Sequence, residues 1–185
     1  MKIMIVDDKF DNVYMLETLL TGSGYQILKA KNGAEALGII QTDKPDLIIS
    51  DILMPLMDGY TLCREIKRNE KFKNIPFIFY TATYTDPKDE EFALGLGADR
   101  FILKPADPDV FLDIIQNLLD EVIEKNFQPA TPELQPETIV LKEYNEVLIR
   151  KLEDKMRQTE ENEKKLKEYI VELEKRNAGK VKNIR

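Results

Sequence analysis

The chain has 185 residues, 27 basic and 34 acidic side chains, and a net charge of −7, so we expect no nucleic acid partner. One cysteine and no histidine exclude an intramolecular disulfide, a multi-cysteine zinc site, a histidine-based catalytic triad and a phosphohistidine on this chain. No apolar run approaches the ~18 residues that a membrane span needs, and Asp7 and Asp8 follow too early for a signal peptide, so we expect a cytoplasmic protein without membrane contacts.

Short apolar runs alternate with amphipathic stretches along the first 125 residues. Five runs are rich in β-branched or aromatic residues and are predicted to be strands: Ile3–Val6, Tyr25–Leu28, Leu47–Ile49, Phe77–Tyr80 and Phe101–Leu103. Five stretches between and after them have helical spacing: Asn12–Leu20, Ala34–Ile40, Tyr60–Arg68, Lys88–Leu96 and Asp107–Ile123. This order predicts the α/β class, with a doubly wound, flavodoxin-like, five-stranded parallel sheet in the order 2-1-3-4-5.

The composition changes near residue 125. Three of the nine prolines fall between residues 129 and 136, and all eight phenylalanines lie at or before Phe127. We therefore predict a compact domain over residues 1–125, a proline-rich linker over 126–136 and a separate segment over 137–185.

The last segment is predicted to be a long helix and a probable coiled coil. It lacks proline after residue 137, and its apolar residues recur with helical spacing. The positions 159, 163, 166, 170, 173, 177 and 180 alternate steps of four and three, whereas 148, 152 and 156 form a stutter. A coiled-coil dimer is favoured over a lone charged helix. Asn177 would fix a parallel register, or would simply lie in a fraying end before Gly179.

Four of the five predicted strands end in polar groups: Asp7 and Asp8, Asp51, Thr81, and Lys104. Ligands of open α/β sheets bind beyond the carboxyl ends of the strands. Three carboxylates in one crevice repel each other, and a hard cation such as Mg²⁺ relieves that repulsion. A lysine and a hydroxyl suit a phosphate oxygen, and an aspartate can be the nucleophile toward a phosphoryl group. Alternatively, each aspartate only forms a turn or caps a helix.

These residues resemble the receiver domain of two-component response regulators. The resemblance covers about residues 1–125 and rests on Asp7-Asp8, Asp51-Ile52-Leu53-Met54-Pro55-Leu56-Met57-Asp58-Gly59, Thr81-Ala82 and Phe101-Ile102-Leu103-Lys104-Pro105. It implies that Asp51 accepts a phosphoryl group from a sensor histidine kinase. It also implies that Thr81 and Lys104 contact the phosphoryl oxygens.

The resemblance further implies a metal site and a switch. Mg²⁺ would be bound by Asp8, Asp51 and the backbone carbonyl of Leu53, with Asp7 acting mainly through water. The peptide bond before Pro105 would be cis. Thr81 and Phe101 would be the switch residues that reshape the face made by the fourth helix, the fifth strand and the fifth helix. Phe101 lacks the hydroxyl of a tyrosine, and its alternative role is that of an ordinary strand aromatic.

We therefore expect a phosphorylation-switched signalling protein rather than a turnover enzyme, with a homodimer formed through the tail or through the switch face. One alternative is a constitutive coiled-coil scaffold with a receiver-like cap. Another is an N-terminal fragment of a larger signalling protein, because no output domain is recognisable. An aspartyl-phosphate phosphatase is disfavoured, since such enzymes place a second aspartate where this chain has Leu53.

Overall fold

The computed structural model describes residues 1–82 and 87–132, and in the tail residues 142, 144, 145, 149, 152, 153, 156, 157 and 159–170. The chain divides into two units, Met1–Gln135 and Pro136–Arg185. The tail positions 148, 173 and 177 lie outside the described residues.

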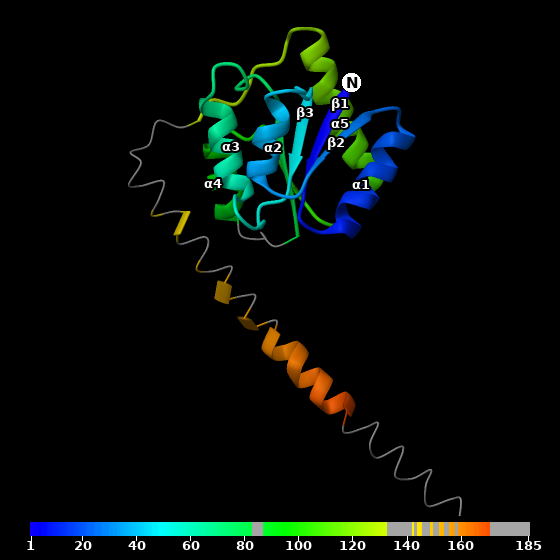
Figure 1. Ribbon diagram of the computed structural model, residues 1–185, viewed down its shortest axis with the longest axis vertical. Helices are drawn as coiled ribbons and strands as arrows, with labels where there is room; N and C mark the ends of the chain where they lie inside the picture. The colour runs from blue at the N-terminus through cyan, green and yellow to red at the C-terminus, as the bar shows by residue number, and fades with distance from the viewer. Residues whose placement is uncertain are drawn as a thin grey trace, which may run out of the picture. The chain divides into compact units, whose positions relative to one another are not determined.

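The first unit is built on one five-stranded parallel sheet in the order β2-β1-β3-β4-β5 (Figure 1). Its strands are β1 (Lys2–Val6), β2 (Gln26–Ala30), β3 (Leu47–Ser50), β4 (Phe77–Thr81) and β5 (Arg100–Leu103). The predicted fold class and strand order are confirmed. All carboxyl ends of the strands therefore open at the same edge of the sheet, where the polar residues were expected to meet.

Helices cover both faces of the sheet. They are α1 (Phe10–Gly22), α2 (Gly33–Ile40), α3 (Gly59–Arg68), α4 (Pro87–Gly95) and α5 (Pro108–Ile123). In Figure 1, α1 and α5 lie on one side of the sheet, and α2, α3 and α4 lie on the other. This layering explains why the central strands are apolar on both faces, with no polar alternation.

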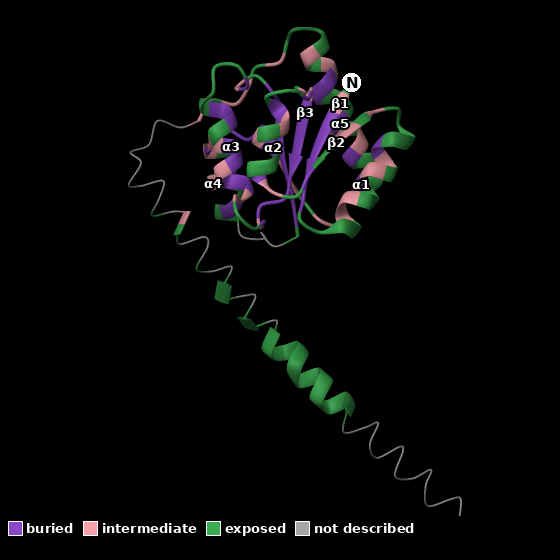
Figure 2. Cartoon of the chain, viewed as in Figure 1, coloured by how far each residue is buried: buried purple, intermediate pink, exposed green. Residues whose placement is uncertain are grey.

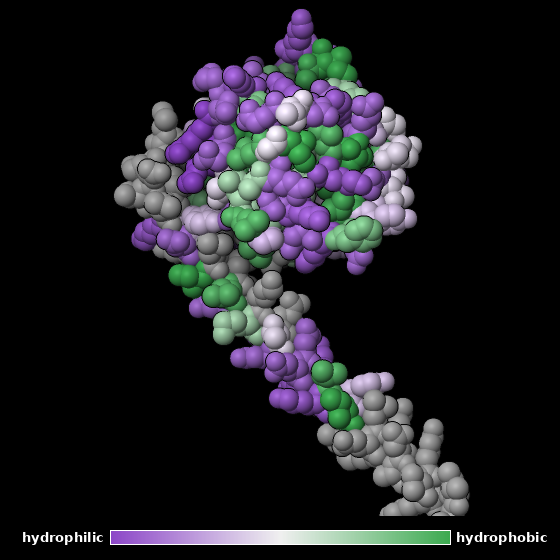
Figure 3. Space-filling view, in the orientation of Figure 1, coloured by the Kyte–Doolittle hydropathy of each residue, from purple (hydrophilic) through white to green (hydrophobic). Residues whose placement is uncertain are grey.

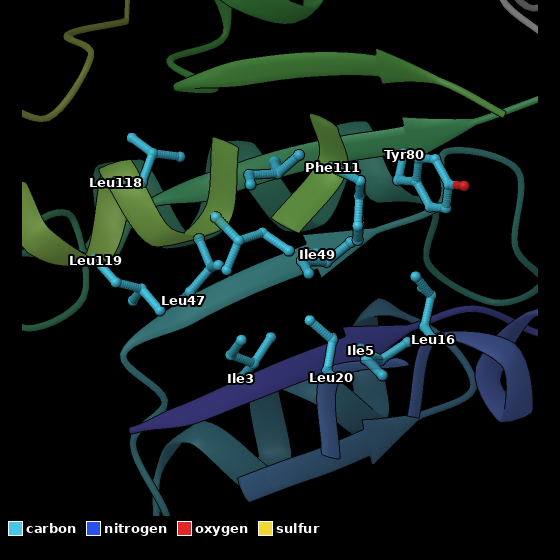
Figure 4. Packing of buried hydrophobic residues seen from close by; sticks show 12 residues of the cluster. Ile3, Ile5, Leu16, Leu20, Leu47, Ile49, Tyr80, Phe111, Leu118 and Leu119 are labelled. Atoms are coloured by element: carbon cyan, nitrogen blue, oxygen red, sulfur yellow. The ribbon is translucent and has the colours of Figure 1, made fainter. Parts of the chain in front are cut away.

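Successive side chains of each strand point to opposite faces of the sheet, so the strands contribute to a hydrophobic core on each face. Ile5 and Ile49 pack in one cluster with Leu16 of α1 and Phe111 of α5 (Figure 4). On the opposite side, the ring of Phe79 meets the ring of Tyr60 edge to face at 5.3 Å. Figure 2 shows that the central strands β1, β3 and β4 are almost wholly buried, which is the main source of stability for this unit, whereas the edge strands β2 and β5 are partly exposed.

Polar side chains fix where three helices begin. Asn32 accepts a hydrogen bond from the backbone N–H of Glu35 at the start of α2, Asp58 caps α3, and Asp107 caps α5. Helix α1 has no such cap, because Lys9 occupies that position. Instead, the backbone N–H of Lys9 donates to Asp7 Oδ1 at 2.8 Å, so a carboxylate at the end of β1 orders the start of α1.

The segment after α5, residues 126–132, packs against the rest of the first unit and is called the strap below. Phe127 is half-buried against the core that lies under α1 and α5. The backbone N–H of Ala130 donates to Asp99 Oδ1 at 2.8 Å. The other oxygen, Asp99 Oδ2, accepts from Lys67 Nζ and from the Phe77 N–H, each at 2.7 Å. The strap is therefore anchored on a buried ion pair.

In the tail, every described residue is helical, and residues 159–170 form an unbroken stretch. Figure 3 shows hydrophobic side chains between hydrophilic ones along this described part. The large apolar residues there are exposed rather than covered: Ile149, Leu152, Met156, Leu166, Tyr169 and Ile170. Among the described residues, no helix combines the length and the apolar character that a bilayer crossing requires.

Candidate functional site

The ends of β1 and β3 bring two aspartates side by side. Val6 and Ser50 are paired in the sheet, so the next residues, Asp7 and Asp51, follow neighbouring strands. Each of these residues makes one further backbone hydrogen bond to the neighbouring strand: the Asp7 N–H donates to Ala30 O, and the Asp51 N–H donates to Val6 O. Both carboxylates are therefore held by the backbone of the sheet and not by a mobile loop.

Asp8 completes a group of three carboxylates. One oxygen of each of Asp7, Asp8 and Asp51 lies within 4.8 Å of the others. Asp7 and Asp51 are buried, whereas Asp8 is exposed, so the group opens to solvent on one side. An oxygen-only donor set with room for water ligands suits Mg²⁺ better than Zn²⁺. The residues present therefore fit the predicted metal.

Lys104, which follows β5, reaches across to this group. Its Nζ donates to Asp7 Oδ2 at 2.6 Å and lies 3.8 Å from Asp51 Oδ1. The Lys104 N–H bonds to Thr81 O at 2.8 Å, and the ammonium lies 5.1 Å from the centre of the Tyr80 ring. The peptide bond between Lys104 and Pro105 is cis, as the resemblance implied. The lysine is thus placed between two carboxylates and is closer to Asp7.

Two buried oxygens at the site have no hydrogen-bond partner among the described residues. They are Asp51 Oδ1 and Thr81 Oγ1. Burial raises the pKa of the Asp51 carboxyl above its usual value, and the Lys104 ammonium opposes part of that rise. The Thr81 side chain is itself among the groups that favour the charged form of Asp51 and lower its pKa, so the two oxygens are neighbours at this edge of the sheet.

A glycine lets the helix after β3 approach the phosphoacceptor candidate. A Cβ atom on Gly59 would lie 2.2 Å from the carbonyl oxygen of Asp51, a distance that no side chain tolerates. The Gly59 N–H donates to Ile52 O at 2.9 Å and closes the loop. Leu53 is half-buried within that loop, whereas Leu56 has a positive φ of 67° and is 91% exposed.

The structure thus brings together Asp7, Asp8, Asp51 and Lys104, with Thr81 at the end of the neighbouring strand. Phe101 lies apart, on β5 beside Phe79, and is half-buried, which is compatible with both of its predicted roles. Sequence reasoning missed Asn12, whose Nδ2 donates to Asp7 Oδ2 at 2.8 Å, and it missed the Tyr80 ring beside Lys104. The only signal for Asn12 is its place one turn into α1, whose start Asp7 orders.

A comparison with protein families decides the identity of the domain. Residues 3–116 match the model of the response regulator receiver domain, which is more than half of the chain. The chain belongs to the response regulator receiver family. The receiver domain therefore carries the three carboxylates, the lysine and the threonine described above.

Relatives and solved structures agree with this assignment. The chain is 39% identical over 118 residues to a protein of Cyanophora paradoxa named "Probable transcriptional regulator ycf27", covering 64% of this chain and 48% of that protein. It is similarly 39% identical over 111 residues to the alkaline phosphatase synthesis transcriptional regulatory protein PhoP of Bacillus subtilis, covering 58% of this chain and 43% of PhoP. The chain thus spans about half the length of the curated relatives it matches.

Two solved structures resemble the receiver domain closely in fold. The signal receiver domain of a histidine kinase from Syntrophus aciditrophicus is 40% identical with a TM-score of 0.62, covering 65% of this chain and 91% of that one. The receiver domain of the sensor histidine kinase PA1611 from Pseudomonas aeruginosa is 28% identical with a TM-score of 0.60, covering 64% and 97%. That second structure has a magnesium ion coordinated in its active-site cleft.

Proposed function

We propose that this protein is a phosphorylation-switched signalling protein of a two-component system, and that Asp51 accepts a phosphoryl group from a phosphohistidine of a sensor histidine kinase. The observation that carries the proposal is the buried Asp51 Oδ1, which accepts no hydrogen bond from the described residues and lies 3.8 Å from Lys104 Nζ on the same sheet edge as the Thr81 hydroxyl. The carboxylates that cap helices differ from it, because Oδ1 of Asp58 and Oδ1 of Asp107 each accept a backbone N–H at the start of a helix.

In the transfer, an Asp51 carboxylate oxygen forms a bond to phosphorus while the bond from phosphorus to the kinase imidazole nitrogen breaks. The nitrogen keeps the electron pair of that bond. Lys104 and Thr81 act on the phosphoryl oxygens, one as a positive charge and the other as a hydrogen-bond donor. Bound Mg²⁺, held by Asp8, Asp51 and the Leu53 carbonyl with Asp7 acting through water, would supply further positive charge against those oxygens.

The geometry also supports a switch. Lys104 pairs with Asp7 at 2.6 Å and lies farther from Asp51, at 3.8 Å. A phosphoryl group on Asp51 adds negative charge, which attracts the lysine and the Thr81 hydroxyl. Lys104 directly follows β5, so its movement biases the face made by α4, β5 and α5. Leu94, Leu103 and Val110 expose apolar side chains from these three elements.

The remaining parts of the proposal concern the whole protein. We propose that it acts in the cytoplasm, as an acceptor domain and not as a turnover enzyme, without binding nucleic acid. It signals as a homodimer formed through the tail or through the α4-β5-α5 face. Since the matched part of the chain covers only about half of each curated relative, these statements concern activities that reach beyond the receiver domain.

A constitutive coiled-coil scaffold is the second candidate, and the exposed apolar residues of the tail favour it. Both candidates contain the same tail, but only the first needs a reactive Asp51. They are therefore separated by whether the domain can be phosphorylated and whether phosphorylation changes its behaviour.

The test is incubation of the full chain with acetyl phosphate and Mg²⁺, followed by intact-mass measurement and light scattering. We expect the mass of one phosphoryl group on the parent chain and none on Asp51→Asn. Asp113→Asn, which alters an exposed carboxyl on α5, is the matched control and should be modified like the parent. Equal labelling of all three proteins would refute the assignment of Asp51, and no labelling of the parent would favour the scaffold.

A further inference from the structure

The exposed apolar side chains of the tail define a helical seam. Ile149, Leu152, Met156, Leu166 and Ile170 are each between 46% and 62% exposed, although they are large and apolar. Thr159 and Glu163 occupy the two positions between the third and the fourth of them. The seven positions follow one another by steps of three and four, which is the heptad repeat of coiled coils.

Ile149 removes the stutter that the sequence suggested at Leu148. With Ile149 as the first seam residue, the steps are three, four, three, four, three and four, without interruption. Ile149, Met156, Glu163 and Ile170 are then a positions, and Leu152, Thr159 and Leu166 are d positions. All seven residues are described, helical and exposed.

We propose that this seam pairs with the seam of a second copy of the chain in the antiparallel direction, with residue 161 at the centre of the pair. The proposal deepens the homodimer part of the proposed function, because it names the surface, the partner and the direction. Leu152 would face Ile170 of the second copy, and Met156 would face Leu166 of the second copy. Both of these layers are apolar on both sides.

The central layers decide the direction. In an in-register parallel pair, each residue faces its own equivalent, so Glu163 would meet Glu163 of the second copy within the seam. Like charges that face each other across an interface oppose association. In the antiparallel pair, Glu163 faces the small, neutral Thr159 of the second copy, which leaves the carboxylate room to reach water. The antiparallel pair thus avoids the one like-charge contact in the seam.

The residues that flank the seam agree with this direction. In an antiparallel pair, e positions face e positions, so Glu153 lies near Lys167 of the second copy, and this contact occurs twice by symmetry. The Glu160 side chains of the two copies approach once, at the solvent-exposed rim, where water screens them. Exposed charge pairs contribute little to the stability of a dimer. The charges beside the seam are therefore consistent with the antiparallel direction, but the seam residues determine it.

We take a second copy of the chain as the partner of the seam, because the order of apolar and polar residues along the seam matches its own reverse. Six of the seven seam positions, from Leu152 to Ile170, are arranged symmetrically about residue 161, so reversing the helix places apolar on apolar and polar on polar. A helix with exposed apolar residues and many charges gains little stability from its own sequence, and packing against a partner supplies what it lacks. For a partner of different sequence, this internal symmetry has no purpose.

Two variants of the full chain that each add one cysteine to the native Cys63, Leu152→Cys and Ile170→Cys, test the proposal by oxidation of each alone and of an equal mixture. The native Cys63 is buried, and burial raises the pKa of its thiol, so it stays unreactive. In the antiparallel pair, the two cysteines face each other only in the mixture. We expect about tenfold more disulfide-linked dimer in the mixture than in either variant alone.

Each other outcome has a definite meaning. Linkage of Leu152→Cys with itself to the same extent as in the mixture indicates a parallel pair and overturns the direction. If no sample links and the parent chain sediments as a monomer, the second copy is not the partner. Glu161→Cys, at an outward position of the helix, is the control for random collisions and should give only background linkage.

A second substitution tests the direction without cysteine. In the antiparallel pair, Thr159→Lys places an ammonium opposite Glu163 of the second copy, so the dimer should dissociate at about tenfold lower concentration. In a parallel pair, the same change places two lysines opposite each other and weakens the dimer. These experiments use unphosphorylated protein, so their failure leaves the phosphorylation of Asp51 untouched, and the failure of phosphorylation leaves them unaffected.

Discussion

The same chemical change, glycine to alanine, should have opposite effects at two places in the receiver domain. Gly38 lies on the exposed side of α2, where a Cβ atom would meet nothing within 4 Å. At Gly59, a Cβ atom would lie 2.2 Å from Asp51 O and 3.0 Å from Ile52 Cα, both of which are backbone atoms. Backbone atoms cannot relieve a clash by a change of rotamer as a flexible side chain can, so the loop that carries Asp51 must shift.

The magnitudes follow from these contacts. Gly38→Ala should raise the free energy of unfolding by about 0.5–1 kcal/mol, because alanine loses less chain entropy than glycine in a helix. Gly59→Ala should lower it by about 1–3 kcal/mol, as forced insertion of a methyl group into packed structure does. Gly33→Ala should fall between them, because its Cβ would meet the flexible side chain of Met57 at 2.6 Å.

Urea unfolding followed by circular dichroism measures these differences, and the acetyl phosphate reaction reports on the site. We expect the order of stability Gly38→Ala, parent, Gly33→Ala, Gly59→Ala, with slower labelling of Asp51 only in Gly59→Ala. A Gly59→Ala protein as stable and as reactive as the parent would show that α3 does not approach the Asp51 backbone as closely as the structure has it.

Three further predictions concern charged groups. Because the pKa of Asp51 is raised in the folded state, the folded protein binds more protons than the unfolded protein between the two pKa values, and its stability falls as pH rises through that window. Asp51→Asn should therefore be more stable than the parent above the window and equally stable below it. Urea unfolding without Mg²⁺ at several pH values measures this difference. Mg²⁺ at 100 times its dissociation constant should stabilise the parent by about 2.7 kcal/mol in thermal unfolding, and an equal gain in Asp8→Asn would argue against the metal site. Asp99→Asn leaves the buried Lys67 ammonium without a counter-charge and should lower the free energy of unfolding by about 3–5 kcal/mol. Asp43→Asn removes a carboxylate that pairs with a lysine at the surface and should change the free energy of unfolding by less than about 1 kcal/mol. Similar losses in the two variants would contradict the burial of the Lys67–Asp99 pair.

The sheet and most of the site were predictable because both depend on local patterns. Short apolar runs fix the strands, and parallel strands bring their carboxyl ends to one edge, so Asp51 and Lys104 could be placed together although they are distant in sequence. The start of α1 was predicted two residues late, at Asn12 instead of Phe10. Its cap comes from Asp7, which belongs to the end of the preceding strand, and not from the residue at the cap position.

The strap was not predictable in the same way. Its prolines are typical of a linker, and nothing in residues 126–132 marks the packing of Phe127 or the bond from Ala130. That bond depends on Asp99, whose carboxylate is oriented by Lys67 and by the Phe77 N–H. Three residues separated by tens of positions must fold before the acceptor exists, so local composition cannot reveal it.

A charged residue lies at each end of the short strand β5, and one of the two holds the strap. Asp99, immediately before β5, holds Ala130, and Lys104, immediately after β5, contacts Asp7. The two residues are roughly 16 Å apart along an extended chain. Any sliding of this strand that lets the lysine follow a new negative charge therefore pulls on the point where the polypeptide leaves the domain. The four residues of β5 therefore connect phosphorylation at the carboxyl edge of the sheet to the attachment of the strap at the opposite edge.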